Sequence, residues 1–151
     1  MNILLIIGRL AFVAIFVLSG AQKLMDIGAT AAMIGPKLVV PAQLASFAAQ
    51  LEGATGMTTP QLMAVAAGVV ELAGGLMIAA NIGTRVAALA LIVFTVAATY
   101  WFHDFWTMAG GDRMNNMAHA LKNLSLVGAL LVFFVIGPWR PGGGDTAEPH
   151  L

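Results

Sequence analysis

Charged side chains inside long apolar segments are the residues of this sequence best suited to chemistry. Arg9, Glu71 and Lys122 each lie in a mainly aliphatic run that is long enough to cross a bilayer. Because an ionised side chain in a membrane span is costly, each of these residues must have a partner, a polar cavity or a task. We therefore expect function to reside near these three positions.

The first two charges could neutralise each other. If the first two membrane helices are antiparallel, a rise of about 1.5 Å per residue places Arg9 and Glu71 at similar depths, within reach of an arginine side chain. We therefore expect a buried Arg9–Glu71 ion pair, in which the glutamate stays ionised. An unpaired glutamate would instead rise in pKa and could relay protons. The small residues that would let a neighbouring helix approach Glu71 are Ala64, Ala67, Gly68, Gly74, Gly75 and Ala79.

A second group of polar side chains gathers at the opposite end of the expected bundle. His119, Lys122 and Asn123 are three and four residues apart, so they share one helical face near the start of the last apolar run. The first and third runs end on the same side and add further polar and aromatic residues. Such donors suit a quinone carbonyl or a small anion. The candidate ligand-binding residues are Lys122, His103, Lys23, Asn123, His119 and Trp106.

Several of these residues also have simpler explanations. Lys23 could extend to the headgroups as an interfacial anchor, and Trp101 and Trp106 could belong to an aromatic belt. His103 and His119 could ligate haem or a metal, with nine methionines available as axial partners. No ligand motif at fixed spacing accompanies them, so we expect neither a metal site nor haem.

Composition defines the class of protein. Of the 151 residues, 60% are hydrophobic and only 9% are charged, which is typical of an integral membrane protein. The formal net charge of zero argues against nucleic-acid binding. The absence of cysteine removes disulfides, thiol catalysis, Cys-ligated zinc and iron–sulfur clusters. A redox role would therefore need a borrowed cofactor, such as a quinone, or a partner.

Hydropathy predicts an all-α, four-helix transmembrane bundle in one domain, about residues 1–140, followed by a flexible tail at 141–151. We expect the first run to be a retained span, because no lysine or arginine precedes it as in a secretory signal. After Pro41, apolar residues at helical spacing predict a short amphipathic interfacial helix between the first and second spans. The expected spans are about residues 3–24, 59–80, 84–102 and 117–136.

The distribution of lysine and arginine does not decide the orientation in the membrane. With the N terminus in the cytoplasm, the two sides receive similar numbers of basic residues. We favour the bacterial inner membrane with both termini cytoplasmic.

At the level of motifs, the sequence resembles the DoxX family of small four-span membrane proteins. The similarity extends over nearly all of the chain except the tail. It rests on five motifs in the expected order: Gly8-Arg9 with Leu18–Leu24, Gly68–Leu76, Gly83–Leu89, His103–Trp106, and Lys122–Leu124 with Gly128.

This resemblance implies a fold more firmly than an activity. The family takes its name from a membrane subunit similar to those associated with thiosulfate:quinone oxidoreduction, other members are linked with redox or oxidative-stress functions, and many have no established activity. The recurrent polar positions of the family correspond to Arg9, Lys23, Glu71, Arg85, His103, Lys122 and Asn123.

Three functions are consistent with the sequence. The leading hypothesis is a quinone-linked redox or oxidative-stress-related subunit, for example of a membrane oxidoreductase, that binds a quinone headgroup or small anion at the mouth of the bundle. The alternatives are a non-catalytic accessory subunit that stabilises a larger membrane complex, and a small-solute transporter. We expect the lipid bilayer, together with a membrane protein or further copies of the chain, as partners.

Overall fold

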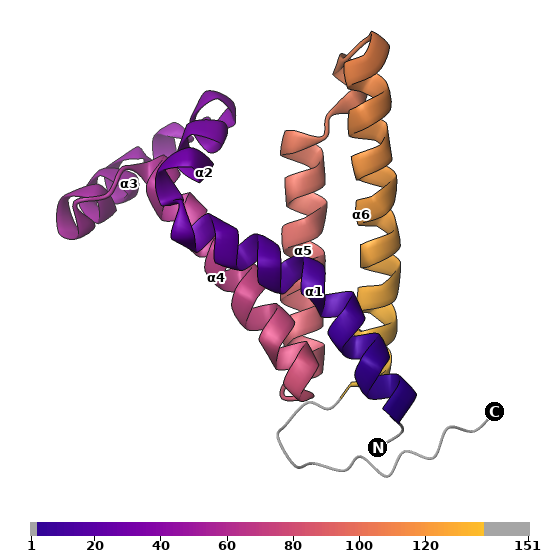
Figure 1. The fold of residues 1–151 in the computed structure, drawn as a ribbon. Coiled ribbons are helices and arrows are strands. Elements are labelled where there is room, and N and C mark those ends of the chain that lie inside the picture. Colours follow the sequence, from indigo (N-terminus) through magenta and orange to yellow (C-terminus); the bar gives the residue numbers. More distant parts are fainter. Residues whose placement is uncertain (1–2, 138–151) are drawn as a thin grey trace.

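The computed structural model describes residues 3–137, which form helices without any strand in that range (Figure 1). Four helices are long and apolar enough to cross a membrane, as hydropathy predicted. The expected tail at 141–151 and the last residues of the expected domain, 138–140, lie outside the described residues. The four long helices are α1 (Ile3–Met25), α4 (Thr59–Ala80), α5 (Thr84–Phe102) and α6 (Gly110–Ile136).

Short helices fill the connection between the first two spans. These are α2 (Ile27–Ile34), the 3-10 turn η1 (Gly35–Lys37) and α3 (Ala42–Thr55). The α2 helix packs on α4, whereas α3 has no buried residue. Leu44, Phe47 and Leu51 are exposed on α3, as expected of the predicted interfacial helix.

The last helix begins earlier than hydropathy predicted, at Gly110 rather than near 117. Its first two turns, residues 110–116, are mainly polar, so a search for apolar residues overlooks them. Gly110 has a φ of +59°, and Asp112 places a negative charge at the positive end of the helix dipole. The polar turns extend α6 beyond its apolar segment, next to the 3-10 turn η2 (Phe105–Thr107).

The antiparallel helices α1 and α4 are held together by close backbone contact. A Cβ added to Gly20 would lie 2.6 Å from the Leu72 backbone nitrogen, and one added to Gly75 would lie 2.9 Å from Val17 Cγ2. Backbones can approach this closely only where side chains are absent. These glycines fix the level at which each residue of α1 faces α4.

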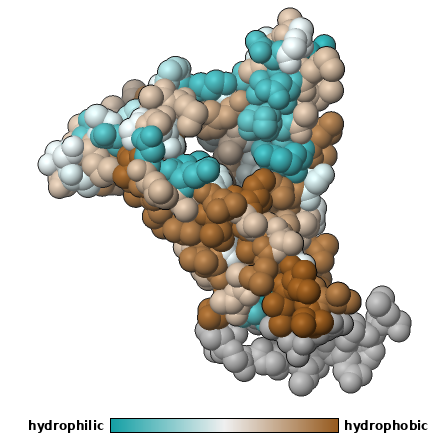
Figure 2. Space-filling model, in the orientation of Figure 1, coloured by the Kyte–Doolittle hydropathy of each residue, from teal (hydrophilic) through white to brown (hydrophobic). Residues whose placement is uncertain are grey.

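The bundle is packed at one end and hollow at the other. The pair α1–α4 and the pair α5–α6 converge near the turn between α4 and α5 and diverge toward the opposite end (Figure 1). Figure 2 shows the hollow between these two helix pairs, which form the two arms of the molecule. Near the packed end, the Arg85 guanidinium donates to the carbonyls of Gly137 and Val135, at 2.5 and 3.2 Å. The buried core consists of Val13, Phe16, Ile78, Ala87, Ala88, Leu91 and Leu130.

A carboxylate joins the interfacial helix to the start of α4. Glu52 Oε1 accepts hydrogen bonds from the backbone nitrogen and the hydroxyl of Thr59, at 2.5 and 2.6 Å. These two bonds, the one from the hydroxyl foremost, hold the pKa of the Glu52 carboxyl below its ordinary value. Because the pKa is lower in the folded state, the stabilisation is present above the unfolded pKa and is lost as the pH falls through the folded value.

We expect acidification below about pH 4 to loosen the joint between α3 and α4, because the ordinary glutamate pKa is about 4.3 and that of Glu52 is lower. The measurement is the protection factor of the Thr59 amide in hydrogen exchange, compared between neutral and acidic pH. In the matched control, Glu52→Gln, a neutral oxygen accepts the same bonds at every pH, so protection should not depend on pH. The same acid response in both proteins would contradict the assignment.

Candidate ligand-binding cavity

A cavity of about 400 Å³ lies between the two helix pairs toward their divergent end. Residues of α1, α2, α4, α5 and α6 line it, so every membrane helix contributes a wall. Its volume is within the range of small-molecule sites, about 300–1,000 Å³. Most of the lining is aliphatic or aromatic, including Phe16, Met33, Phe94 and Phe102.

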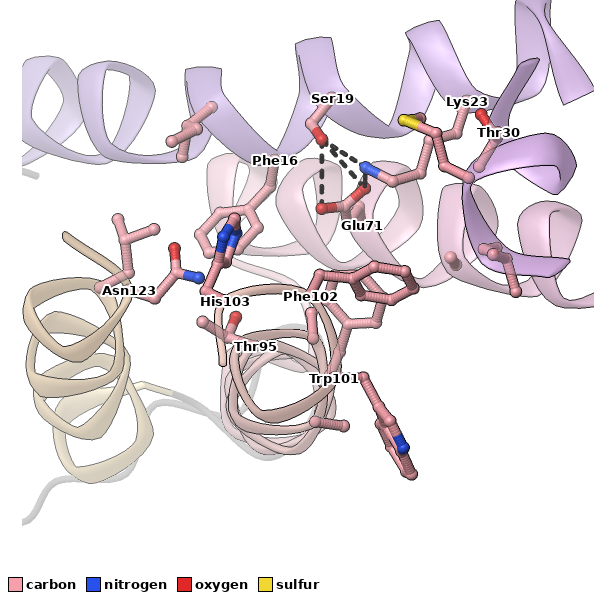
Figure 3. Close-up of a pocket in the computed structure, with 18 of the residues that line it drawn as sticks. Phe16, Ser19, Lys23, Thr30, Glu71, Thr95, Trp101, Phe102, His103 and Asn123 are labelled. Carbon is pink, nitrogen blue, oxygen red and sulfur yellow. Dashed lines mark hydrogen bonds and ion pairs between the residues drawn. The ribbon is translucent and has the colours of Figure 1, made fainter. Parts of the chain in front are cut away.

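A charged cluster forms the wall contributed by α1 and α4 (Figure 3). Lys23 Nζ lies 2.6 Å from Glu71 Oε2, and the Ser19 hydroxyl is 3.2 Å from each oxygen of the same carboxylate. Lys23 also donates to Ser19 Oγ at 2.5 Å. Ser19 and Lys23 are neighbours because they are four residues apart on α1. The side chains of Lys23 and Glu71 are 25% and 8% exposed, so the pair is largely removed from solvent.

The predicted partner of Glu71 was wrong: its ion pair is with Lys23 and not with Arg9. The prediction aligned the start of α1 with the end of α4. Gly20 instead contacts α4 at Gly68 and Leu72, so Glu71 lies level with the C-terminal half of α1. Arg9 is eleven positions before Gly20, roughly 16 Å along the helix.

Arg9 has a different environment, near the packed end. It is buried, its guanidinium carbon lies 5.8 Å from the centre of the Phe133 ring, and its Nη1 has no hydrogen-bond partner. A cation over an aromatic face is a favourable arrangement, which contributes roughly 0.5–2 kcal/mol depending on desolvation. Arg9 therefore connects α1 to α6 rather than to α4.

The facing wall of the cavity carries neutral polar groups from α5 and α6 (Figure 3). Asn123, which is buried, donates to the Thr99 hydroxyl at 2.9 Å, and Thr99 in turn donates to the Thr95 carbonyl at 2.7 Å. Thr95 Oγ1 is buried without a hydrogen-bond partner. This wall therefore contains an unused polar atom.

The orientation of His103 follows from its own hydrogen bond. Its Nδ1 lies 3.1 Å from Asn116 Oδ1, and the amide nitrogen of Asn116 donates to the Asp112 carbonyl at 3.0 Å. Since Asn116 Oδ1 can only accept, Nδ1 of His103 carries the proton. In the neutral ring, Nε2 is then the nitrogen that can accept a hydrogen bond from a ligand.

Four of the six predicted ligand candidates line the cavity: Lys23, His103, Lys122 and Asn123. His119 instead stacks on His103, with ring centres 4.9 Å apart and planes at 15°. Trp106 is exposed and packs against Tyr100 and Phe105 at the surface. Neither His119 nor Trp106 is among the residues that line the cavity.

Three hydroxyl side chains that line the cavity were not among the predicted ligand residues: Ser19, Thr30 and Thr95. A spacing of four residues from Lys23 could have identified Ser19. Threonine is common in apolar helices, so no comparable signal marked Thr30 or Thr95. Within residues 3–137, no three His, Asp or Glu side chains are grouped as a metal site requires.

An ion pair joins the two arms at the divergent end. Lys37, in η1, lies 2.8 Å from Asp104, which follows α5. Both side chains are partly exposed, at 37% and 27%. This ion pair therefore joins the segment between α1 and α4 to the end of α5, close to His103.

Comparison with known proteins identifies the family. The DoxX family profile matches residues 4–104, about two thirds of the chain. The chain belongs to the DoxX family. Inner membrane protein YphA of Escherichia coli (strain K12) is 29% identical over 136 residues, which is 90% of this chain and 84% of YphA. No solved structure matches the sequence significantly.

The DoxX match and the four apolar helices identify an integral membrane protein. The matched range includes α1, α4 and α5, and therefore Ser19, Lys23 and Glu71. The α6 helix lies beyond it, with Lys122 and Asn123. One wall of the cavity is thus built within the DoxX match and the other is completed by a helix outside it.

Proposed function

We propose that this DoxX-family protein is a quinone-binding subunit of a membrane redox system and that its cavity holds the quinone headgroup. The observation that carries the proposal is an apolar cavity between membrane helices with polar groups on two facing walls. A benzoquinone ring has the matching chemistry, because it is flat and apolar and has a carbonyl acceptor at each end.

The two walls offer different donors. On the α1–α4 wall, Lys23 and Ser19 are donors already engaged with Glu71. On the other wall, the Lys122 ammonium and the Thr95 hydroxyl can donate to the second carbonyl. Phe16 and Phe102 supply aromatic surface between the walls.

The charge of the site favours a neutral ring over a small anion in the interior. Glu71 neutralises Lys23, and Lys122, the other cation of the lining, is exposed. An anion inside would face the Glu71 carboxylate without a buried cation of its own. An accessory role or solute transport would not require this arrangement.

The chain has no cysteine, so a partner protein exchanges electrons with the bound quinone. The start of α1 and the end of α6 lie at the same end of the bundle, and we assign this end to the cytoplasmic side of the bacterial inner membrane (Figure 1). The domain comprises about residues 1–140.

The test is a titration of purified protein in nanodiscs with a tail-less benzoquinone, followed by calorimetry. We expect saturable binding, and we expect Lys122→Met to weaken it about tenfold, the effect of one hydrogen bond of about 1.4 kcal/mol.

Arg113→Ala is the matched control for this titration. Arg113 is an exposed cation on the same helix as Lys122 and is not part of the lining, so its replacement should leave binding unchanged. No binding to the native protein, or equal binding by all variants, would refute the quinone site. Displacement by sulfate or phosphate would point to an anion site instead.

A further inference from the structure

A shallow apolar groove runs along the outer surface of α5. Its lining consists only of aliphatic and aromatic residues: Ile92, Val93, Val96, Ala97, Tyr100 and Trp101. Val93, Ala97 and Trp101 are spaced by four, so they form a stripe along one face of the helix, roughly 12 Å long. The stripe lies on a helix that is long and apolar enough to cross a membrane.

The groove and the cavity meet at two residues. Ala97 and Trp101 line both. Trp101 is 54% exposed, and its side chain extends away from the cluster around Glu71 (Figure 3). The cavity therefore borders the exposed apolar face of α5 beside Trp101.

Other features of this side also suit an entrance from the bilayer. Met33 and Met63 line the cavity and are exposed, at 65% and 45%, and methionine adapts readily to a passing apolar group. Toward the end of the bundle, the Lys37–Asp104 ion pair connects the two arms. The apolar route beside Trp101 is thus bordered by a polar contact.

We propose that the groove on α5 holds the isoprenoid tail of the quinone whose headgroup occupies the cavity, and that this ligand enters sideways from the bilayer past Trp101. The inference rests on the proposed function, and it specifies the substrate class as long-tailed, membrane-resident quinones. Headgroup and tail are covalently joined, and the cavity and the groove share Ala97 and Trp101, so a headgroup in the cavity places its tail at the groove. Moving the tail from lipid into the groove contributes little to the binding free energy, because lipid and groove have similar polarity.

The test compares a tail-less benzoquinone with a long-chain isoprenoid quinone, both titrated into protein in nanodiscs. Ala97→Phe fills the junction between cavity and groove. Because Ala97 lines both spaces, we expect it to weaken the binding of both ligands, and long-chain binding about tenfold more than tail-less binding. Ala90→Phe is the matched control, because Ala90 is exposed on the same helix and lines neither space.

A second variant guards against misfolding of Ala97→Phe. Tyr100→Ala removes an exposed side chain that lines the groove and not the cavity, and we expect it to weaken long-chain binding while leaving tail-less binding unchanged. If the native protein binds tail-less quinone but neither variant distinguishes the two ligands, the groove is not the tail site and the headgroup site still stands. If the native protein binds neither quinone, the proposed function fails and this inference fails with it.

Discussion

Gly20→Ala is expected to lower the free energy of unfolding by about 1–3 kcal/mol, the usual cost of overpacking a tight contact. The new methyl group would lie 2.6 Å from the Leu72 nitrogen and 2.7 Å from the Gly68 carbonyl oxygen. Both are backbone atoms of α4 and cannot rotate away, so α1 and α4 must separate. A larger residue such as leucine at position 20 should prevent the pair from forming.

Gly8→Ala provides the matched control on the same helix. A Cβ at Gly8 meets nothing within 4 Å, so the substitution should be neutral or should stabilise by up to about 1 kcal/mol through helix propensity. The measurement is unfolding of the purified proteins by denaturant in detergent micelles. Equal stabilities for the two variants would show that the glycine contact does not hold the pair together.

The second large effect is expected from Lys23→Met, which leaves the buried Glu71 carboxylate without its cation. Breaking a fully buried pair costs about 3–5 kcal/mol, and the partial exposure of Lys23 reduces this to about 2–3 kcal/mol. Adding Glu71→Gln to the same protein should recover part of the loss, since a neutral amide needs no counter-ion. The same unfolding assay measures both proteins and gives their coupling.

Lys37→Met distinguishes burial from ion pairing in general. The Lys37–Asp104 pair has a similar length, 2.8 Å, but is more exposed, so its loss should cost no more than about 1 kcal/mol. Equal free energies of unfolding for Lys23→Met and Lys37→Met would show that the buried Lys23–Glu71 pair stabilises the fold no more than the exposed pair does.

The sequence predicted the long helices more accurately than the contacts between their side chains. A bilayer requires each span to be a continuous helix of apolar residues, so hydropathy alone located the four long helices. It missed the start of α6, because polar turns beyond the apolar segment carry no such signal. It also assigned Arg9 to Glu71, because the relative level of two helices is set by which glycines touch and not by where the helices end.

The candidate site shows the same division. The high cost of a charge in a membrane identified Arg9, Glu71 and Lys122 from sequence. Glu71 and Lys122 line the cavity, whereas Arg9 lies over the Phe133 ring and does not. Neutral hydroxyls such as that of Thr95 cost too little to stand out in a sequence. The stacking of His119 behind His103 depends on side-chain packing between α5 and α6, which helical spacing does not specify.

The uneven packing of the bundle also has a mechanical consequence. The buried Leu91 and Leu130, with the Arg85 hydrogen bonds, fix the two helix pairs to each other near one end, which therefore acts as a pivot. His103, which lines the cavity twelve residues after Leu91, is about 18 Å from this pivot, so a tilt of about 5° displaces it by about 1.6 Å. The two helix pairs therefore convert a rotation too small to disturb the packed end into a change in cavity width close to the van der Waals radius of a methyl group.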